Sequence, residues 1–204
     1  MNQETRAARL AVIDLQNVFA DPGSLWFAPD LPGILDPVRR LAAAFGDRTT
    51  FTRFIAPDEP VGAWRPYYSQ WPFALQPPDS DIYRLVDEFA ADAGPTVDAT
   101  TFSKWTPRLA GLVGGAGRLV LAGVATDCCV LSTAVAAADA GVAVQVVADA
   151  CAGSSREAHQ QALGILRLYA PLIEVVGLED ILGPAAVTRR GVSRQESVRR
   201  DGRT

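Results

Sequence analysis

A short apolar run that ends at a glycine and leads into a helix-forming segment is the feature that most restricts the fold of this chain. Residues 119–122 are too few for a helix and rich in branched side chains, which indicates a buried strand. Gly123 permits a sharp turn, and Thr126 and Asp127 are favoured helix N-cap residues. The alanine-rich residues 128–140 then predict a helix that begins at the carboxyl end of the strand.

Two adjacent cysteines, Cys128 and Cys129, fall in the first turn of that predicted helix. Unpaired N–H groups and the helix dipole favour a thiolate there, so we expect a lowered thiol pKa. Cys128 is expected to pack against the sheet, and Cys151, after a later strand, to be structural. Three cysteines, two of them adjacent, do not make a disulfide framework, which predicts a reducing, cytoplasmic location.

The same alternation of strand and helix recurs along the chain and predicts one α/β domain. Strands are expected at residues 10–13, 49–54, 97–99, 119–122, 142–148 and 172–176, and helices at 34–45, 82–89, 107–113, 128–140, 154–169 and 178–182. This pattern predicts a three-layer sandwich with a mainly parallel six-stranded sheet, in the Rossmann-like order 3-2-1-4-5-6, and helices on both faces.

Local signals refine these boundaries. Asp36 before Pro37 offers an alternative start for the first helix, because proline is favoured at the first helical position. Ser154 with Glu157 makes a capping-box pattern. Residues 56–80 carry six prolines and an aromatic cluster, which predicts a long irregular segment of the kind that is functional or forms an interface.

The distribution of charge separates a domain from a tail. The net charge is −4, but six arginines against two acids give residues 184–204 a charge of +4, which leaves −8 for residues 1–183. We expect residues 1–183 to form the domain and residues 184–204 a basic C-terminal tail. An acidic body disfavours nucleic acid as a partner.

Membrane and export signals are not evident. No apolar run reaches the roughly 20 residues of a membrane-spanning helix. The polar residues 1–9 lack the apolar core of a signal peptide. We therefore expect a small-molecule substrate, with no nucleic acid and no membrane, and a homo-oligomer (dimer or tetramer) that covers the aromatic segment.

Two charged residues are candidates for chemistry. Asp14 directly follows the first strand, so its carboxylate lies at the sheet edge where open α/β folds bind ligands. The chain has 18 arginines and a single lysine, Lys104, which indicates that this position needs an amine rather than any cation. The only histidine, His159, lies in a predicted helix and is expected to be structural.

Three stretches together resemble a known family. Residues 123–130 (Gly-Val-Ala-Thr-Asp-Cys-Cys-Val), 13–19 (Ile-Asp-Leu-Gln-Asn-Val-Phe) and 102–104 (Phe-Ser-Lys) are similar to the isochorismatase-like cysteine hydrolases. That superfamily includes nicotinamidases, N-carbamoylsarcosine amidases and ureido hydrolases. The likeness covers about residues 8–180.

The resemblance implies a catalytic triad of Asp14, Lys104 and Cys129. Cys129 would attack an amide carbonyl, and Asp14 would take the thiol proton and return it to the leaving nitrogen. It also implies a cis peptide between Val124 and Ala125, and an oxyanion hole formed by the backbone N–H groups of Ala125 and Cys129.

Substrate contacts are expected from residues near these motifs. The candidates are Gln16, Phe19, Trp64, Tyr67, Trp71 and Trp105. An aromatic wall of this kind suits a planar or ring-bearing amide. The same side chains could instead pack a subunit interface, and both interpretations stay open.

Metal chemistry is not expected, and neither is a cofactor. Nicotinamidases bind a metal through an aspartate and histidines after the second strand, whereas residues 52–58 contain no histidine here. We therefore expect a metal-independent amidohydrolase that cleaves a non-peptide C–N bond of a small amide or ureido (carbamoyl) substrate through a thioester. The alternatives are an isochorismatase-type enol-ether hydrolase, in which Cys129 is idle, and a non-enzymatic α/β binding module.

Overall fold

Six parallel strands form a single sheet at the centre of the protein. The structure, a computed structural model, describes residues 8–91 and 93–183, so the predicted basic tail lies outside the described residues. The strand order β3-β2-β1-β4-β5-β6 confirms the predicted topology. The strands are β1 (Arg9–Ile13), β2 (Thr49–Phe54), β3 (Val97–Ala99), β4 (Arg118–Val124), β5 (Ala143–Ala152) and β6 (Ile173–Val176).

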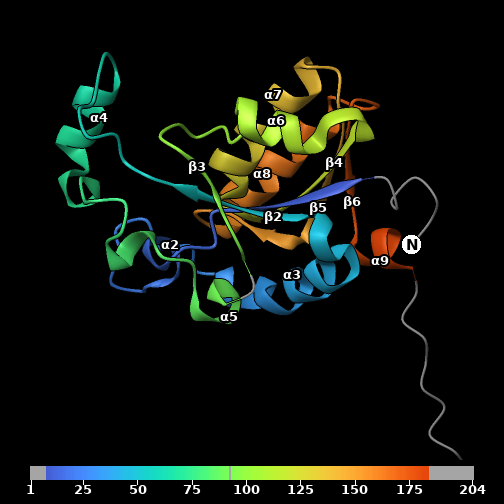
Figure 1. The fold of residues 1–204 in the computed structure, drawn as a ribbon, viewed down its shortest axis with the longest axis horizontal. Helices are drawn as coiled ribbons and strands as arrows, with labels where there is room; N and C mark the ends of the chain where they lie inside the picture. The colour runs from blue at the N-terminus through green and yellow to red at the C-terminus, as the bar shows by residue number, and fades with distance from the viewer. Residues whose placement is uncertain (1–7, 92, 184–204) are drawn as a thin grey trace, which may run out of the picture.

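Helices cover both faces of the sheet, as predicted (Figure 1). One face carries α3 (Leu31–Phe45), α5 (Asp87–Ala90) and α9 (Leu178–Leu182); the other carries α6 (Pro107–Val113), α7 (Leu131–Asp139) and α8 (Arg156–Arg167). Two short helices, α2 (Asn17–Ala20) and α4 (Trp64–Gln70), lie beyond one end of the sheet. No helix among the described residues is long and apolar enough to span a membrane.

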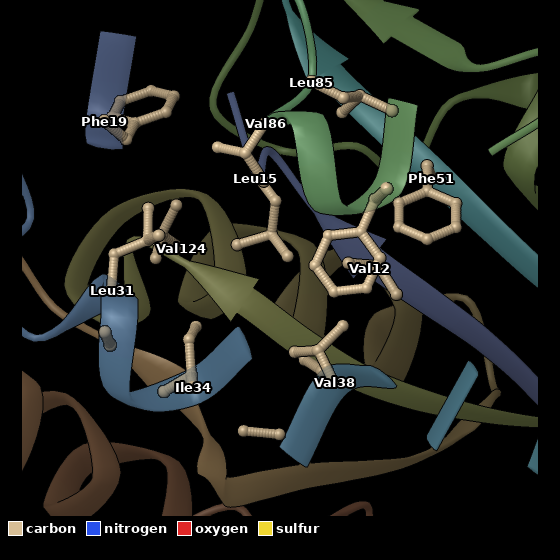
Figure 2. Packing of buried hydrophobic residues seen from close by; sticks show 14 of the residues in the cluster. Val12, Leu15, Phe19, Leu31, Ile34, Val38, Phe51, Leu85, Val86 and Val124 are labelled. Carbon is tan, nitrogen blue, oxygen red and sulfur yellow. The ribbon is translucent and has the colours of Figure 1, made fainter. Parts of the chain in front are cut away.

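The strands divide their side chains between two hydrophobic cores because successive residues of a strand face opposite sides of the sheet. In β1, Leu10 and Val12 belong to the core under α3, whereas Ala11 and Ile13 belong to the core under α7 and α8. Figure 2 shows the first core, in which Val12 of β1 lies near Val38 of α3. Each fully buried residue of this size stabilises the fold by roughly 1.5–3 kcal/mol.

The first long helix begins earlier than one sequence signal indicated. Helix α3 starts at Leu31 with Pro32 in its first turn, so a start at Asp36–Pro37 is wrong. Pro37 lies inside the helix, although it lacks the N–H that an interior position normally donates. The apolar stripe of α3, which is buried against the sheet, outweighs that lost hydrogen bond.

Two other segments differ from the sequence-based expectation. Residues 56–80 are not wholly irregular, because α4 forms within them and projects from the body of the molecule (Figure 1). Residues 82–89 are not one helix but a 3₁₀ turn, Asp81–Tyr83, followed by α5. Proline-rich and aromatic segments have no clear period, so their structure follows from long-range packing. The homo-oligomer and the cytoplasmic location stay predictions.

Candidate active site

The two central strands bring the candidate acid and thiol to the same edge of the sheet. β1 pairs with β4 in parallel, with Ile13 opposite Gly123. Gly123 has a φ of 109°, and a Cβ atom there would collide with the backbone of Ile13. Only glycine permits this close approach, which sets the end of β1, and so Asp14, beside the turn that follows β4.

Asp14 is a fully buried carboxylate held in an uncommon backbone conformation. Its φ is 49°, in the left-handed region, which costs of the order of 1–3 kcal/mol for a residue other than glycine. The hydroxyl of Thr52 on β2 donates to Asp14 Oδ1 at 2.7 Å and accepts from the Asp14 N–H at 3.2 Å. Thr52 therefore fixes both the backbone and one carboxylate oxygen and leaves Oδ2 facing the site.

Lys104 joins the carboxylate to a thiol. Its side chain is fully buried, and Nζ lies 3.0 Å from Asp14 Oδ2 and 3.9 Å from Cys129 Sγ. The ammonium also donates to the backbone carbonyls of Thr101 at 2.8 Å and Phe102 at 3.2 Å. Burial lowers the pKa of Lys104, but the Asp14 carboxylate, together with the neighbouring cysteines in their thiolate form, raises it more, so the net pKa is above its usual value. The amine remains charged.

A threonine that sequence reasoning missed places Lys104 against the nucleophile turn. The backbone N–H of Lys104 donates to Thr133 Oγ1 at 2.8 Å, and that hydroxyl donates to the Cys129 carbonyl at 2.6 Å. The spacing of four residues between Cys129 and Thr133 was an available signal, since helical threonines commonly bond the carbonyl one turn back. Its link to Lys104 spans 29 residues and has no local signal.

The turn after β4 is not the start of a regular α-helix. The Val124–Ala125 peptide bond is cis. Residues Thr126–Val130 form one π-helical turn, closed by a hydrogen bond from the Val130 N–H to the Ala125 carbonyl, before α7 begins at Leu131. Such turns are frequent at functional sites. The prediction of one helix over residues 128–140 is therefore wrong at its start.

Asp127 has a different partner from the one predicted. The N-cap position belongs to Ala125, and the Asp127 carboxylate accepts instead from the N–H and the hydroxyl of Ser154, at 2.8 and 2.7 Å. Because Ser154 is occupied in this way, α8 is capped by Ser155, one residue later than the predicted capping box. Both differences have one cause, the contact between the turn and the start of α8.

His159 makes a second link between α8 and the turn. Its Nδ1 lies 2.8 Å from the Thr126 hydroxyl. Burial lowers the pKa of His159, so the ring is neutral near pH 7. The histidine is therefore a structural partner of the turn, as its position in a helix indicated.

A lowered pKa was predicted for both adjacent cysteines, but only Cys128 has one. Hydrogen bonding to Cys128, burial and the Asp14 carboxylate raise the pKa of Cys129 well above its usual value. The hydrogen bond with Cys129 lowers the pKa of Cys128 instead. The prediction was wrong for Cys129 because its hydrogen bond with Cys128, its burial and the Asp14 carboxylate together outweigh the helix terminus. Cys129 is thus a neutral thiol that needs a base.

A pocket of about 410 Å³ opens above these groups. Its wall consists of Phe19, Leu25, Trp26, Phe27, Phe54, Tyr67, Trp71, Phe102, Ala125, Asp127, Cys128, Cys129 and Ser154. The structure therefore brings predicted substrate contacts Phe19, Tyr67 and Trp71 to the cleft that contains Cys129. Cys128 also lines this pocket and is partly exposed, so it is not simply packed against the sheet.

Three other predicted substrate contacts lie outside the pocket wall. The Gln16 amide is buried and bonds the backbone of Phe54 and Tyr83, so it serves the core. Trp64 packs edge-on against Tyr67 at 5.2 Å between ring centroids and supports the wall from behind. Trp105 packs against the core under α7 and α8.

Trp26 is the principal pocket residue that sequence reasoning missed. It lies between the first predicted strand and the first predicted helix, where no element was expected, yet its ring is within 5.1–6.3 Å of the ring centroids of five others. Those rings belong to Phe19, Phe54, Tyr67, Trp71 and Phe73. Trp26 therefore joins the segment after β1 to the aromatic segment near α4.

Comparison with known proteins agrees with this fold and its motifs. The family model for the isochorismatase domain matches residues 8–179. The chain belongs to the isochorismatase family of hydrolases, which confirms the resemblance drawn from the three motifs. No curated protein matches the sequence closely enough to count as a relative.

Solved structures with this fold include hydrolases from several organisms. A cysteine hydrolase from Pseudomonas syringae pv. phaseolicola 1448A superposes with a TM-score of 0.76 at 18% identity, over 89% of this chain and 92% of that chain. A pyrazinamidase of Pyrococcus horikoshii in complex with zinc gives 0.66 at 23%, over 84% and 99%. A pyrazinamidase/nicotinamidase from Streptococcus mutans UA159 gives 0.64 at 26%, over 83% and 99%.

The three cysteines should differ in reactivity. Limited treatment with iodoacetamide, followed by peptide mapping, should label Cys128 first, because its pKa is lowered and it lines the pocket. Its rate should rise with a midpoint below the ordinary thiol pKa of about 8.5. Cys151 should stay unlabelled in the folded protein, because complete burial raises its pKa to about 12. Labelling in denaturant is the control, and equal native rates for Cys128 and Cys151 would contradict the structure.

Proposed function

We propose that this protein is a metal-independent amidohydrolase that cleaves a non-peptide C–N bond of a small amide or ureido substrate through a thioester on Cys129. The observation that carries the proposal is the buried ammonium of Lys104, which contacts both Asp14 Oδ2 and Cys129 Sγ at the floor of an aromatic pocket. A buried acid–amine–thiol set with these contacts is what nucleophilic attack on a carbonyl requires.

In the first half of the reaction, Cys129 Sγ attacks the substrate carbonyl carbon while Asp14 Oδ2 takes the thiol proton. Oδ2 suits this role because its contact with Lys104 is an ion pair, and it accepts no hydrogen bond from the other described residues. The backbone N–H groups of Ala125 and Cys129 stabilise the oxyanion. The tetrahedral species then collapses, Asp14 returns the proton to the leaving nitrogen, and an amine or ammonia departs.

In the second half, water attacks the thioester with Asp14 again as the base. The carbonyl carbon gains the hydroxyl oxygen, the C–S bond breaks, and the proton returns to Cys129, which restores the thiol. Lys104 stays protonated throughout and stabilises whichever of Asp14 and Cys129 carries the negative charge. The raised pKa of Lys104 supports this constant charge.

Metal independence is proposed on the composition of the chain. His159 is its only histidine, and its ring nitrogen Nδ1 is engaged by Thr126. Across residues 8–91 and 93–183, no group of three or more His, Cys, Asp or Glu side chains is placed to hold an ion. The residues therefore do not fit a zinc site of the kind named for the Pyrococcus horikoshii protein.

Release of ammonia from a panel of primary amides and ureido compounds tests the function directly. We expect turnover of at least one ring-bearing amide, unchanged by prior treatment with EDTA. Absence of turnover on the whole panel would remove the amidohydrolase assignment. Activity that disappears with EDTA and returns with added zinc would remove the claim of metal independence. The enol-ether alternative predicts hydrolysis that survives the Cys129→Ala substitution.

A further inference from the structure

The pocket wall contains an acidic side chain and no basic one. Asp14 and Lys104 neutralise each other as a buried ion pair beneath it. Asp127 is the one carboxylic acid among the thirteen lining residues, and none of the thirteen is Arg, Lys or His. The lowered pKa of the adjacent Cys128 can only add negative charge. The described pocket wall thus presents negative charge and no cation to an entering ligand.

The apolar part of the same wall is dominated by aromatic rings. Seven of the thirteen lining residues are aromatic: Phe19, Trp26, Phe27, Phe54, Tyr67, Trp71 and Phe102. The faces of such rings carry partial negative charge and attract organic cations, most strongly when the rings belong to Trp or Tyr. Aromatic rings alone would also bind a neutral ligand. The preference for a cationic ligand therefore depends on the carboxylate of Asp127 beside the rings.

Asp127 lies at the pocket wall, where its carboxylate can favour a cationic ligand over a neutral one. Its carboxylate is held by Ser154 through two hydrogen bonds, of 2.8 and 2.7 Å, which fix its orientation at the pocket wall. An ionised carboxylate offers about four acceptor positions, so about half remain for a ligand. Asp127 is only partly buried and lines the pocket, so a ligand there can reach its carboxylate.

We propose that the pocket selects amides whose acyl part carries a positively charged organic group, such as a quaternary ammonium, with Asp127 and the aromatic wall as the cation site. This proposal depends on the proposed function for the position of the scissile amide at Cys129. The acidic body supports it from a distance, since a net charge of −8 over residues 1–183 attracts cationic ligands and repels anionic ones. Asp127 is then a specificity-determining residue, separate from the triad.

Three amides of similar size separate charge from shape. In 4-(trimethylammonio)butanamide the terminal group is cationic, in 5,5-dimethylhexanamide it is a neutral isostere, and in glutaramate it is an anion. We expect calorimetric titration of the full chain carrying Cys129→Ala, which prevents turnover, to show the cationic amide binding at least about tenfold more tightly than the neutral isostere. Glutaramate should bind most weakly.

Substitutions assign the preference to Asp127. In the same background, Asp127→Asn should lower the ratio of cationic to neutral affinity at least about threefold and leave the affinity for the neutral amide nearly unchanged. Glu157→Gln, which removes one negative charge from the exposed surface of α8 outside the pocket wall, should keep the ratio. Retained binding of the neutral amide also shows that the variant is folded.

A second measurement keeps the proposal testable if Asp127→Asn does not fold. Raising the salt concentration should weaken binding of the cationic amide alone, because charge–charge attraction is screened and apolar contact is not. Equal affinities for the cationic and neutral amides, or a preference for glutaramate, would overturn the proposal. Ammonia release by the wild-type chain is measured separately, so that failure of hydrolysis counts against the proposed function and failure of charge selection against the cation site.

Discussion

Cys129→Ala should lower amide hydrolysis at least about a thousandfold, as expected when the nucleophile of a triad is removed. Cys128→Ala should lower it less than about tenfold. The two side chains are adjacent, line one pocket and are both free thiols, so the pair is a matched comparison of chemistry at one site. Steady-state rates with a substrate from the amide panel give the two ratios.

The difference is expected because Cys129 Sγ lies 3.9 Å from the ammonium Nζ of Lys104, which also holds Asp14. Cys128 has the lower pKa and should react faster with alkylating agents, so reactivity and catalysis should point to different residues. The outcome that reverses the assignment is a larger loss from Cys128→Ala. In that case the nucleophile, and the oxyanion hole with it, would move by one residue.

Lys104→Arg should retain the fold by circular dichroism and lose about a hundredfold or more in activity, which corresponds to about 3 kcal/mol in barrier height. The substitution keeps the charge, so a residue that acts only as a cation would tolerate it. The ammonium, however, is enclosed by Asp14 Oδ2 and the carbonyls of Thr101 and Phe102, at 2.8–3.2 Å. A larger planar guanidinium cannot occupy that position without displacing Asp14.

Two further variants test the charge of Lys104 and provide a control at an exposed position. Lys104→Met leaves Asp14 buried without its partner, so it should destabilise the fold by about 3–5 kcal/mol in denaturant unfolding. Arg108→Lys exchanges the same two residue types at an exposed position of α6 and should leave activity unchanged. Near wild-type turnover in Lys104→Arg would show that Lys104 has no part in the chemistry and that the single lysine is an accident of composition.

The groups at the floor of the site were predictable because each has a local signal. Asp14 and Cys129 follow apolar strands at the edge where parallel sheets bind ligands, and the central position of their strands follows from the topology. Lys104 was marked by its uniqueness in an arginine-rich chain. Short buried strands and helix periodicity are properties of neighbouring residues, so the alternation of strand and helix, and with it the parallel sheet, was predictable as well.

The wall of the site was less predictable because it depends on contacts between distant segments. Trp26 gains its role from rings up to 47 positions away in the chain, at Phe73, and nothing in its own segment indicates them. Asp127 looked like a helix cap because its neighbours fit that pattern, yet Ser154 occupies its carboxylate. The pKa of Cys129 was misjudged because its hydrogen bond with Cys128, its burial and its approach to Asp14 all depend on the folded structure.

The close approach at Gly123 has a consequence for how new specificities can arise in this scaffold. It fixes the acid and the thiol by backbone contact within the sheet, independently of the segments that carry Trp26, Tyr67 and Trp71. Those segments can change in length and composition while the reacting groups keep their positions. Directed evolution toward other amides should therefore succeed with libraries confined to residues 19–27 and 64–73, and should tolerate no side chain at position 123.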